Sequence, residues 1–444
     1  MADSWSASSN SATSLKLVGP SSPSTGAFNP DFTYPIFGEA ETIYGYKGLD
    51  IKLKFASGDL TTYLKVDYKE KNEGTTAKID NVEASLKQFL PGDYLTDETA
   101  FQDAVLSQET SFRPLGEKVH SYTRSKSSSK GKGRAGKVGS AGDSLAEDDS
   151  NARVFEIYRS TWETRGFREL HRRMQIFALF FIEGASYIQE DEQNWEFFCL
   201  YERVPRGTGD EDGQTSFSWH FAGYTSLYRF WCWPDAARVR LSQFVILPPF
   251  QKQGHGGALY SQVHDEMLKR PSVTEMTVED PSEAFDRLRD GSDLRRLLAP
   301  GGFVDGAKAE GKLRAPLDVK WSESERLKRK IAPRQWSRLV EMLQLMDLRP
   351  DEADQVKAYR LQVKARLFRF NKDILTQLKK SERVVKLQET FESVVDEYGE
   401  LVGVDVEPLL EAAEMGNSGA DVGGSSGANG GHADGPPRKM ARLD

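Results

Sequence analysis

The feature that most constrains this chain is a strand that leads into a glycine-rich loop and then into a helix. Residues 241–247 are a largely apolar, branched run typical of a buried strand, and Pro248 and Pro249 end it because proline cannot donate to a strand ladder. Leu259, Val263 and Met267 then recur at four-residue spacing, which predicts a helix. The glycine loop between them consists of Gln251, Lys252, Gln253, Gly254, His255, Gly256 and Gly257.

Such a loop is suited to hold a phosphate group. Glycines let backbone N–H groups turn toward a ligand, and the first turn of the helix adds unpaired donors and a positive dipole end. Three interpretations fit this pattern. The loop is a turn whose glycines serve packing, or a dinucleotide site with Glu279 as the ribose-binding acid, or an acyl-coenzyme A site. The dinucleotide interpretation fits poorly, because Leu259 stands where its third glycine belongs.

The acyl-coenzyme A interpretation is supported by a resemblance. The seven loop residues match Q/R-x-x-G-x-G/A, which resembles the acyl-coenzyme A loop of the GNAT acetyltransferases. More narrowly, the surrounding sequence resembles the catalytic subunits of type B histone acetyltransferases. The motifs that carry this second resemblance are SQFVILPPFQKQGHGG, VEDP one strand later and a distant IAPRQW helix. It spans roughly residues 35–400, apart from one insertion.

Length and charge bound the class of protein. A chain of 444 residues, 38% hydrophobic and 28% charged, can bury a large core and predicts two or three domains. The formal net charge of −8 disfavours direct nucleic-acid binding and suits a basic partner. Two cysteines exclude a disulfide framework, and the sequence shows neither a bilayer-spanning run nor a secretory signal. We therefore expect an intracellular protein that binds no membrane.

The first part of the chain predicts a small α+β domain. Residues 1–30 are rich in Ser, Ala, Pro and Gly with few large apolar groups, so we expect a disordered lead-in. Residues 31–122 predict a domain with a β-hairpin, whose arms flank residues 56–59, and two short helices.

A flexible basic insertion is expected over residues 123–152, which are rich in Ser, Gly and Lys. Its alternation of glycine and lysine resembles the tail of core histone four. One hypothesis is that Lys132 or Lys137 acts as a pseudosubstrate or is self-acetylated, and the alternative is an inert linker.

Residues 153–303 predict the catalytic core. Its expected elements are a helix at about 159–173, strands at 175–188, 195–204 and 217–233, and then the strand, glycine loop, helix and strand described above. The resemblance to the GNAT enzymes implies this order, with a mixed, mainly antiparallel sheet and flanking helices. Residues 304–405 predict a helical bundle and residues 406–444 a disordered tail. The predicted fold class is α+β.

Two acids follow the strand after the helix. Pro281 suits the first position of a helix, and Asp280 with Glu283 forms a D-x-x-E capping box, which predicts a structural role for Asp280. Glu279 is not needed for that cap and is freer to act on a substrate, although a solvated surface acid is the alternative.

The resemblance implies acetyl transfer from acetyl-coenzyme A to a lysine of a histone tail. A lysine amine has an unperturbed pKa of about 10.4 and is charged at neutral pH, so a base must take its proton. The acid pair of the family maps onto Glu279 and Asp280. We assign the role of general base to Glu279, with Asp280 assisting or substituting.

The resemblance also implies how the coenzyme is held. Phe244, Val245 and Ile246, at the end of the strand, would offer backbone groups to the pantetheine arm and to the developing oxyanion. The glycine loop would hold the diphosphate. Ser282, at the start of the next helix, would touch the coenzyme, with polar capping as the equally plausible alternative. No metal is expected.

The family's histone-tail contacts map onto Glu39 and Glu41 and onto Tyr228, Arg229 and Phe230. The two glutamates suit a basic tail, although solvated surface acids would give the same pattern. Arg229 is discordant because a cation repels a cationic tail, so we expect it to point away. The resemblance implies the N-terminal tail of core histone four as substrate, a WD-repeat histone-binding subunit as partner, and residence in nucleus and cytoplasm.

Two alternatives to this function remain. A GNAT enzyme could act on another amine, such as a protein N-terminus, but the large aromatic N-terminal domain favours a long peptide groove. A non-catalytic acyl-coenzyme A-binding histone carrier is the other alternative. The intact Glu279 and the uninterrupted glycine loop argue against it.

Overall fold

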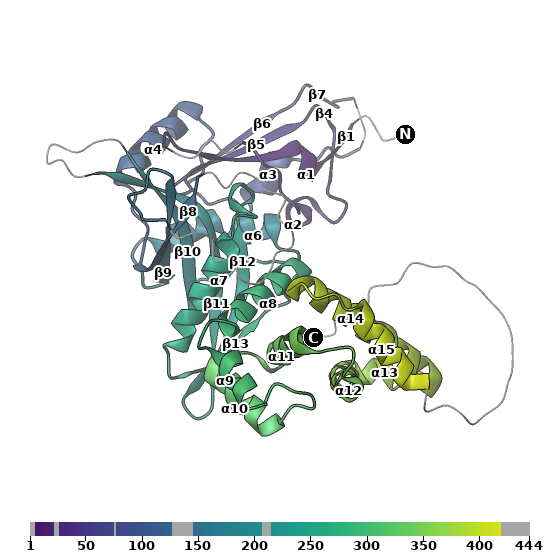
Figure 1. Cartoon of the computed structure of the whole chain (residues 1–444). Coiled ribbons are helices and arrows are strands. Elements are labelled where there is room, and N and C mark those ends of the chain that lie inside the picture. Colours follow the sequence, from purple (N-terminus) through teal and green to yellow (C-terminus); the bar gives the residue numbers. More distant parts are fainter. Residues whose placement is uncertain (1–4, 22–25, 75–76, 127–144, 207–214, 419–444) are drawn as a thin grey trace. The chain divides into compact units, whose positions relative to one another are not determined.

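The computed structural model describes residues 5–21, 26–74, 77–126, 145–206 and 215–418 (Figure 1). The chain divides into two compact units. Unit 1 holds Met1–Leu313, Leu317–Leu343 and Leu401–Gly403, and unit 2 holds Arg314–Pro316, Gln344–Glu400 and Val404–Asp444. Within the described ranges, no helix combines the length and the apolar character that crossing a bilayer requires.

A six-stranded sheet forms the centre of unit 1. Its strand order is β13-β12-β11-β10-β9-β8, and every neighbouring pair is antiparallel except β12 and β13, which are parallel. The predicted α+β class, with a mixed and mainly antiparallel sheet, is therefore confirmed. The strands are β8 (Glu117–Ser125), β9 (Ala152–Thr161), β10 (Trp195–Pro205), β11 (Phe217–Cys232), β12 (Ala236–Ile246) and β13 (Val273–Val278).

The parallel pair needs a crossover connection, and α7 (His255–Leu268) provides it. A 3-10 turn, η1 (Pro248–Phe250), and the glycine loop connect β12 to α7. The predicted apolar stripe of Leu259, Val263 and Met267 is buried. α8 (Glu283–Leu297) follows β13 and packs against α7 (Figure 1). The predicted succession of strand, loop, helix and strand is confirmed.

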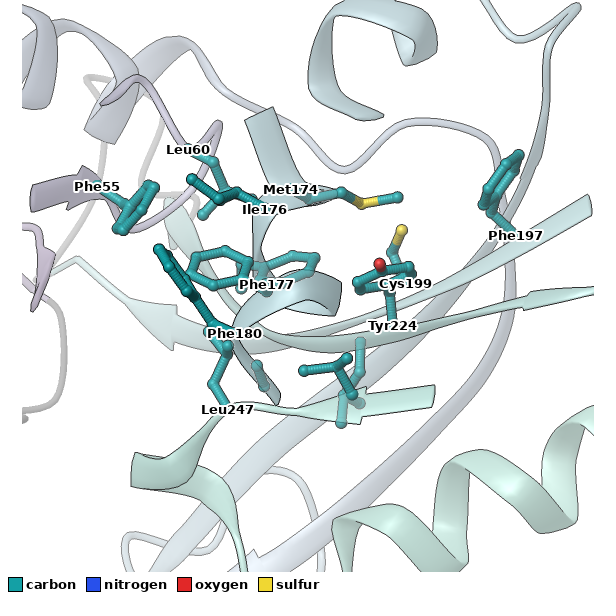
Figure 2. Packing of buried hydrophobic residues seen from close by; sticks show 14 of the residues in the cluster. Phe55, Leu60, Met174, Ile176, Phe177, Phe180, Phe197, Cys199, Tyr224 and Leu247 are labelled. Atoms are coloured by element: carbon teal, nitrogen blue, oxygen red, sulfur yellow. The ribbon is translucent and has the colours of Figure 1, made fainter. Parts of the chain in front are cut away.

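The core of unit 1 includes two short helices, α5 (Phe167–Met174) and α6 (Ile176–Phe181). Figure 2 shows Phe177 and Phe180 of α6 among side chains from other elements, with Phe55 on one side and Leu247 on another. The ring centroids of Phe55 and Phe177 are 4.8 Å apart. All four side chains are fully buried, and each such burial stabilises the fold by about 1.5–3 kcal/mol.

Two predictions in this region are wrong. The strand expected at 175–188 is instead the helix α6, and the helix expected at 159–173 begins only at Phe167, because residues 159–161 complete β9. The run Ile176–Phe181 is apolar at every position. Because periodicity cannot separate a buried helix from a buried strand in such a run, the sequence alone did not distinguish them.

A three-stranded sheet lies in the N-terminal part of unit 1. β2 (Thr13–Val18) pairs in parallel with β5 (Asp50–Ala56), and β5 forms the predicted hairpin with β6 (Thr62–Asp67). The other elements here are β1 (Ser6–Ser8), α1 (Ser9–Ala12), α2 (Tyr34–Phe37), β3 (Thr42–Tyr44), β4 (Tyr46–Lys47), β7 (Glu70–Lys71), α3 (Val82–Lys87) and α4 (Glu98–Ser111).

The disordered lead-in expected over residues 1–30 is therefore wrong for the described residues 5–21. Leu15 and Leu17 of β2 are 0% and 3% exposed, so their burial offsets the entropy of ordering this segment.

The basic insertion has a different outcome. Its central residues 127–144, including Lys132 and Lys137, lie outside the described residues, whereas residues 123–125 complete β8 and Ala152 begins β9.

The remaining elements are helices. Unit 1 contains α9 (Phe303–Ala309), α10 (Val319–Arg329) and the larger part of α11 (Pro333–Asp347). Unit 2 contains α12 (Ala353–Phe370), α13 (Lys372–Leu375), α15 (Glu407–Ser418) and most of α14 (Lys380–Val402). α15 packs against α12 and buries Leu409, so the disorder expected over residues 406–444 is wrong for residues 407–418. Residues 419–444 lie outside the described residues.

Candidate active site

The backbone of the glycine loop departs from ordinary geometry at two residues. Lys252 and Gly254 have φ of +60° and +83°, in the left-handed region. Gly254 is the N-cap of α7, so the turn into this helix depends on a conformation that glycine adopts without strain. At Gly256 a Cβ would lie 2.6 Å from Cδ1 of Leu288 in α8, so this glycine permits the close packing of α7 on α8.

Three side chains of the glycine loop have partners within the protein. His255 is 1% exposed, and its Nδ1 lies 2.8 Å from the Tyr122 hydroxyl oxygen. Oε1 of Gln253 accepts a hydrogen bond from Nη1 of Arg153 at 2.9 Å, and Gln251 donates to the Ile246 carbonyl oxygen at 2.8 Å. Burial, followed by the nearby charges of Arg153 and Arg124, lowers the pKa of His255 to about 3. These bonds hold the loop in shape, and the N–H groups of the first turn of α7, which have no acceptor within the helix, remain as donors for a ligand.

Sequence reasoning missed the residues that brace this loop. Tyr122 and Arg124 come from β8, and Arg153 comes from β9. Nε of Arg124 donates to the Gln253 carbonyl oxygen at 3.3 Å, and its guanidinium lies over the Tyr122 ring, 4.8 Å from the centroid. These residues are a hundred or more positions away along the chain, and no local pattern marks them.

The pairing of β12 with β13 ends before the glycine loop is reached. Their pairing ends at Leu241 with Val278, and the N–H of Glu279 donates to the Leu241 carbonyl oxygen at 2.9 Å. Beyond that point, Phe244, Val245 and Ile246 pair with β11 and, among the described residues, with no other strand. The outer backbone edge of these three residues is therefore not paired with β13.

Glu279 stands where the two strands diverge. Its Oε2 accepts a hydrogen bond from the Ser242 hydroxyl at 2.5 Å, and its Oε1 lies 3.3 Å from Nη1 of Arg240. The side chain remains 42% exposed, so it is oriented by two partners of β12 and still open to solvent. Ser242 and Arg240 were also missed, although a serine and an arginine within a largely apolar strand could have signalled them.

The neighbouring Asp280 has a different environment. It is exposed and has a φ of +30°. The capping box predicted for Asp280 and Glu283 is wrong, because Ser282 is the N-cap of α8 and its hydroxyl accepts the N–H of Phe285 at 3.2 Å. The helix begins two residues later than expected, since Ser282 satisfies an N-terminal donor that Asp280 does not reach. Contact of Ser282 with a coenzyme stays a prediction.

The aromatic residues predicted for the histone tail share a face with the acid. Tyr228 pairs across the strands with Arg240, whose guanidinium lies over the ring of Phe230, 4.6 Å from the centroid. Trp195 of β10 packs edge-on against Tyr228, with centroids 4.9 Å apart. Arg229 points to the opposite face, where Nη2 lies 3.5 Å from the Ser272 hydroxyl, as the sequence led us to expect. Arg240 thus links the aromatic residues to Glu279.

The two predicted substrate acids of the N-terminal part differ from each other. Glu41 accepts hydrogen bonds from the N–H groups of Thr33 and Tyr34, at 2.6 and 3.1 Å, and from Nδ2 of Asn10. The bond from Thr33 is the main reason that the pKa of Glu41 is lowered. Glu41 therefore anchors the start of α2, whereas Glu39 is exposed. Between the described residues 228–230 and these two acids there is no hydrogen bond or ion pair.

Comparison with known proteins identifies the family of this chain. A family model described as histone acetyl transferase HAT1 N-terminus matches residues 5–183, and one described as fungal HAT1, C-terminal, matches residues 290–349. A histone acetyltransferase type B catalytic subunit from Mycosarcoma maydis is 60% identical over 455 aligned residues and covers 100% of both chains. This chain belongs to that family.

Other members of the type B histone acetyltransferase catalytic subunits are more distant. One from Cryptococcus neoformans is 50% identical and covers 85% of this chain and 90% of its own. One from Schizosaccharomyces pombe is 33% identical, with coverage of 90% and 93%. The predicted family is confirmed, and the predicted acyltransferase class with it. Among the described residues no group of three or more His, Cys, Asp or Glu side chains is placed to hold a metal ion.

Proposed function

We propose that this chain transfers the acetyl group of acetyl-coenzyme A to lysine side chains in the N-terminal tail of core histone four, with Glu279 as general base. The observation that carries the proposal is the position of Glu279. It lies where β12 and β13 separate, held by Ser242 and Arg240, on the face that also carries Tyr228 and Phe230.

The residues around the glycine loop fit the coenzyme. Its diphosphate is anionic, and the first turn of α7 presents backbone N–H groups and the positive end of the helix dipole. Gly254 makes the left-handed turn into this helix, and Gly256 lets α7 pack closely on α8. The edge of Phe244, Val245 and Ile246 would pair with the amide groups of the pantetheine arm, as a strand would. Bound there, the coenzyme supplies an acetyl thioester.

The chemistry assigned to the protein is removal of a proton. A lysine amine is nearly all charged at neutral pH and cannot attack a carbonyl carbon until it loses a proton. Glu279 accepts that proton, and the amine nitrogen then bonds to the acetyl carbon as the carbon–sulfur bond breaks. Coenzyme A leaves as its thiolate, which takes the second proton that the nitrogen loses on becoming an amide. The exposed side of the carboxylate leaves room for the amine, while Ser242 and Arg240 fix its orientation. Tyr228 and Phe230 would contact the aliphatic part of the lysine.

Mass spectrometry of a histone-four tail peptide incubated with the full chain and acetyl-coenzyme A tests this proposal. Glu279→Gln should lower turnover by about a hundredfold, the effect typical of losing a general base, while coenzyme affinity measured by calorimetry barely changes. Asp280→Asn is the matched control, because it removes the adjacent exposed carboxylate. If Asp280→Asn is the slower enzyme, the base is Asp280. If the unmodified chain acetylates no histone-four peptide, the substrate assignment is wrong.

We also propose a WD-repeat histone-binding protein as partner and residence in nucleus and cytoplasm. The support is family membership, because the relatives are named catalytic subunits. Size-exclusion chromatography of the mixed proteins should show one complex, and separate elution would contradict the pairing. A fluorescent fusion confined to either compartment would contradict the localisation.

A further inference from the structure

Two arginines from distant parts of unit 1 lie beside the glycine loop. A Cβ at Gly254 would be 3.4 Å from Nη2 of Arg124, which comes from β8. A Cβ at Gly257 would be 3.4 Å from Nη2 of Arg295, which comes from α8. One guanidinium therefore lies at the N-cap of α7 and the other lies beside its first turn.

Neither arginine forms an ion pair with a carboxylate among the described residues. Arg124 bonds to backbone carbonyl oxygens, including those of Thr123 and Gln253, and Arg295 bonds within its own helix, to Gly291 and Ser292. Nearby arginines differ in this respect, since Arg153 pairs with Glu202, and Arg296 pairs with Asp265.

The two charges also influence each other. Partial burial, and then the charge of Arg124, lower the pKa of the Arg295 guanidinium. Two like charges placed together without an acid raise the free energy of the unliganded protein, and an anion bound between them would remove that cost.

Besides its diphosphate, the coenzyme carries a second anionic group that fits this position. Each phosphate of its diphosphate carries about one negative charge, which the N–H groups of the first turn of α7 can meet. Its ribose 3′-phosphate is a monoester with about −1.5 to −2 charge at neutral pH and three acceptor oxygens. Such a group favours guanidinium partners, because arginine presents several donors in a planar fork.

We propose that Arg124 and Arg295 form a subsite for the 3′-phosphate of the coenzyme, separate from the diphosphate site of the glycine loop. The inference rests on the proposed use of acetyl-coenzyme A and adds the feature that distinguishes coenzyme A from its dephosphorylated form. The two arginines act in binding only and take no part in acetyl transfer.

Calorimetry with coenzyme A and with 3′-dephospho-coenzyme A tests this subsite on the full chain. The quantity to compare is the ratio of the two dissociation constants. Arg295→Gln should reduce the preference for coenzyme A about tenfold, the value of one charge-assisted hydrogen bond at a partly exposed site. It is the decisive variant, because the hydrogen bonds of Arg295 stay within α8 and its loss leaves the glycine loop intact.

Arg124→Gln should reduce the same ratio. It should also weaken both ligands, because Arg124 braces the loop through Gln253. Arg296→Gln is the matched control: it removes the same charge from the neighbouring position of α8, but that side chain pairs with Asp265 and bonds to the Ser261 carbonyl. The control should leave the ratio within twofold of the unmodified chain.

An unchanged ratio in Arg295→Gln would overturn the subsite, as would equal losses for both ligands. A change of the ratio in Arg296→Gln as large as that in Arg295→Gln would also overturn it, because general electrostatics would then explain the preference. The outcome for the proposed function is distinct: if the unmodified chain binds neither ligand, coenzyme use itself fails.

Discussion

Gly254→Ala provides a quantitative test of the glycine loop. Gly254 has φ of +83°, and an alanine held in the left-handed region costs about 1–2 kcal/mol. The added Cβ would lie 3.4 Å from Nη2 of Arg124, the end of a side chain that can shift, so the backbone conformation dominates the cost. The folded protein either keeps the strained conformation or relaxes it.

These two responses appear in different measurements. If the loop keeps its shape, the free energy of unfolding falls by about 1–2 kcal/mol and coenzyme affinity is unchanged. If the loop relaxes, stability is preserved, but binding must restore the strained shape, and affinity falls about 5–30-fold. We therefore expect the loss of unfolding free energy and the loss of binding free energy to sum to about 1–2 kcal/mol. Urea denaturation and calorimetry supply the two terms.

Gly184→Ala is the matched control for this experiment. Gly184 has φ of +75°, and a Cβ there would meet no heavy atom within 4 Å. The two variants share the same effect on the unfolded chain, so Gly184→Ala should lose stability alone. The reasoning would be refuted if Gly254→Ala changed neither quantity, or if Gly184→Ala weakened coenzyme binding as much as Gly254→Ala.

Three further predictions concern other parts of unit 1. Ser242→Ala removes the hydrogen bond to Oε2 of Glu279 and should lower turnover about tenfold with unchanged coenzyme affinity; unaltered turnover would show that Arg240 alone orients the acid. Burial lowers the pKa of His171 from 6.5 to about 3, so its stabilising contribution is complete above pH 6.5 and falls by about 1.4 kcal/mol per unit as pH drops toward 3. His171→Phe should lower the slope of unfolding free energy against pH by about 1.4 kcal/mol per pH unit below pH 6.5. An unchanged slope would contradict the lowered pKa of His171. Phe177→Ala should cost about 3–5 kcal/mol of unfolding free energy, whereas Trp233→Ala, at a side chain 82% exposed, should stay within about 0.5 kcal/mol; equal effects would contradict the core assignment.

Local patterns predicted the central part of the site. The strand, the glycine loop and α7 follow one another between Ala236 and Leu268, and each has its own periodicity or turn residues, so no tertiary contact was needed to recognise them. Glu279 could be placed for the same reason, because β13 ends directly before it. The composition of the first thirty residues gave a wrong prediction of disorder. Leu15 and Leu17 alternate with polar residues, as a strand requires.

The remaining parts depended on long-range packing. Tyr122 and Arg153 meet the glycine loop only because β8 and β9 lie in the same sheet as β12. Ser282, and not Asp280, is the N-cap of α8. Serine and aspartate are both good N-cap residues, so the sequence spacing alone could not decide between them. The hydrogen bonds that Glu41 accepts from Thr33 and Tyr34 come from a turn that sequence periodicity does not describe, and its contact with a substrate stays a prediction.

The brace from β8 sets a lower limit on the smallest fragment that could bind coenzyme. A fragment that begins at β9 would contain the whole glycine loop, α7 and Glu279, yet it would lack Tyr122 and Arg124. Nδ1 of the buried His255 would then lose its partner, and the Gln253 carbonyl would lose its donor. We therefore expect a fragment that begins at β9 to lose coenzyme binding, although it keeps every residue of the glycine-loop motif. A fragment that begins before β8 keeps Tyr122 and Arg124 and should bind.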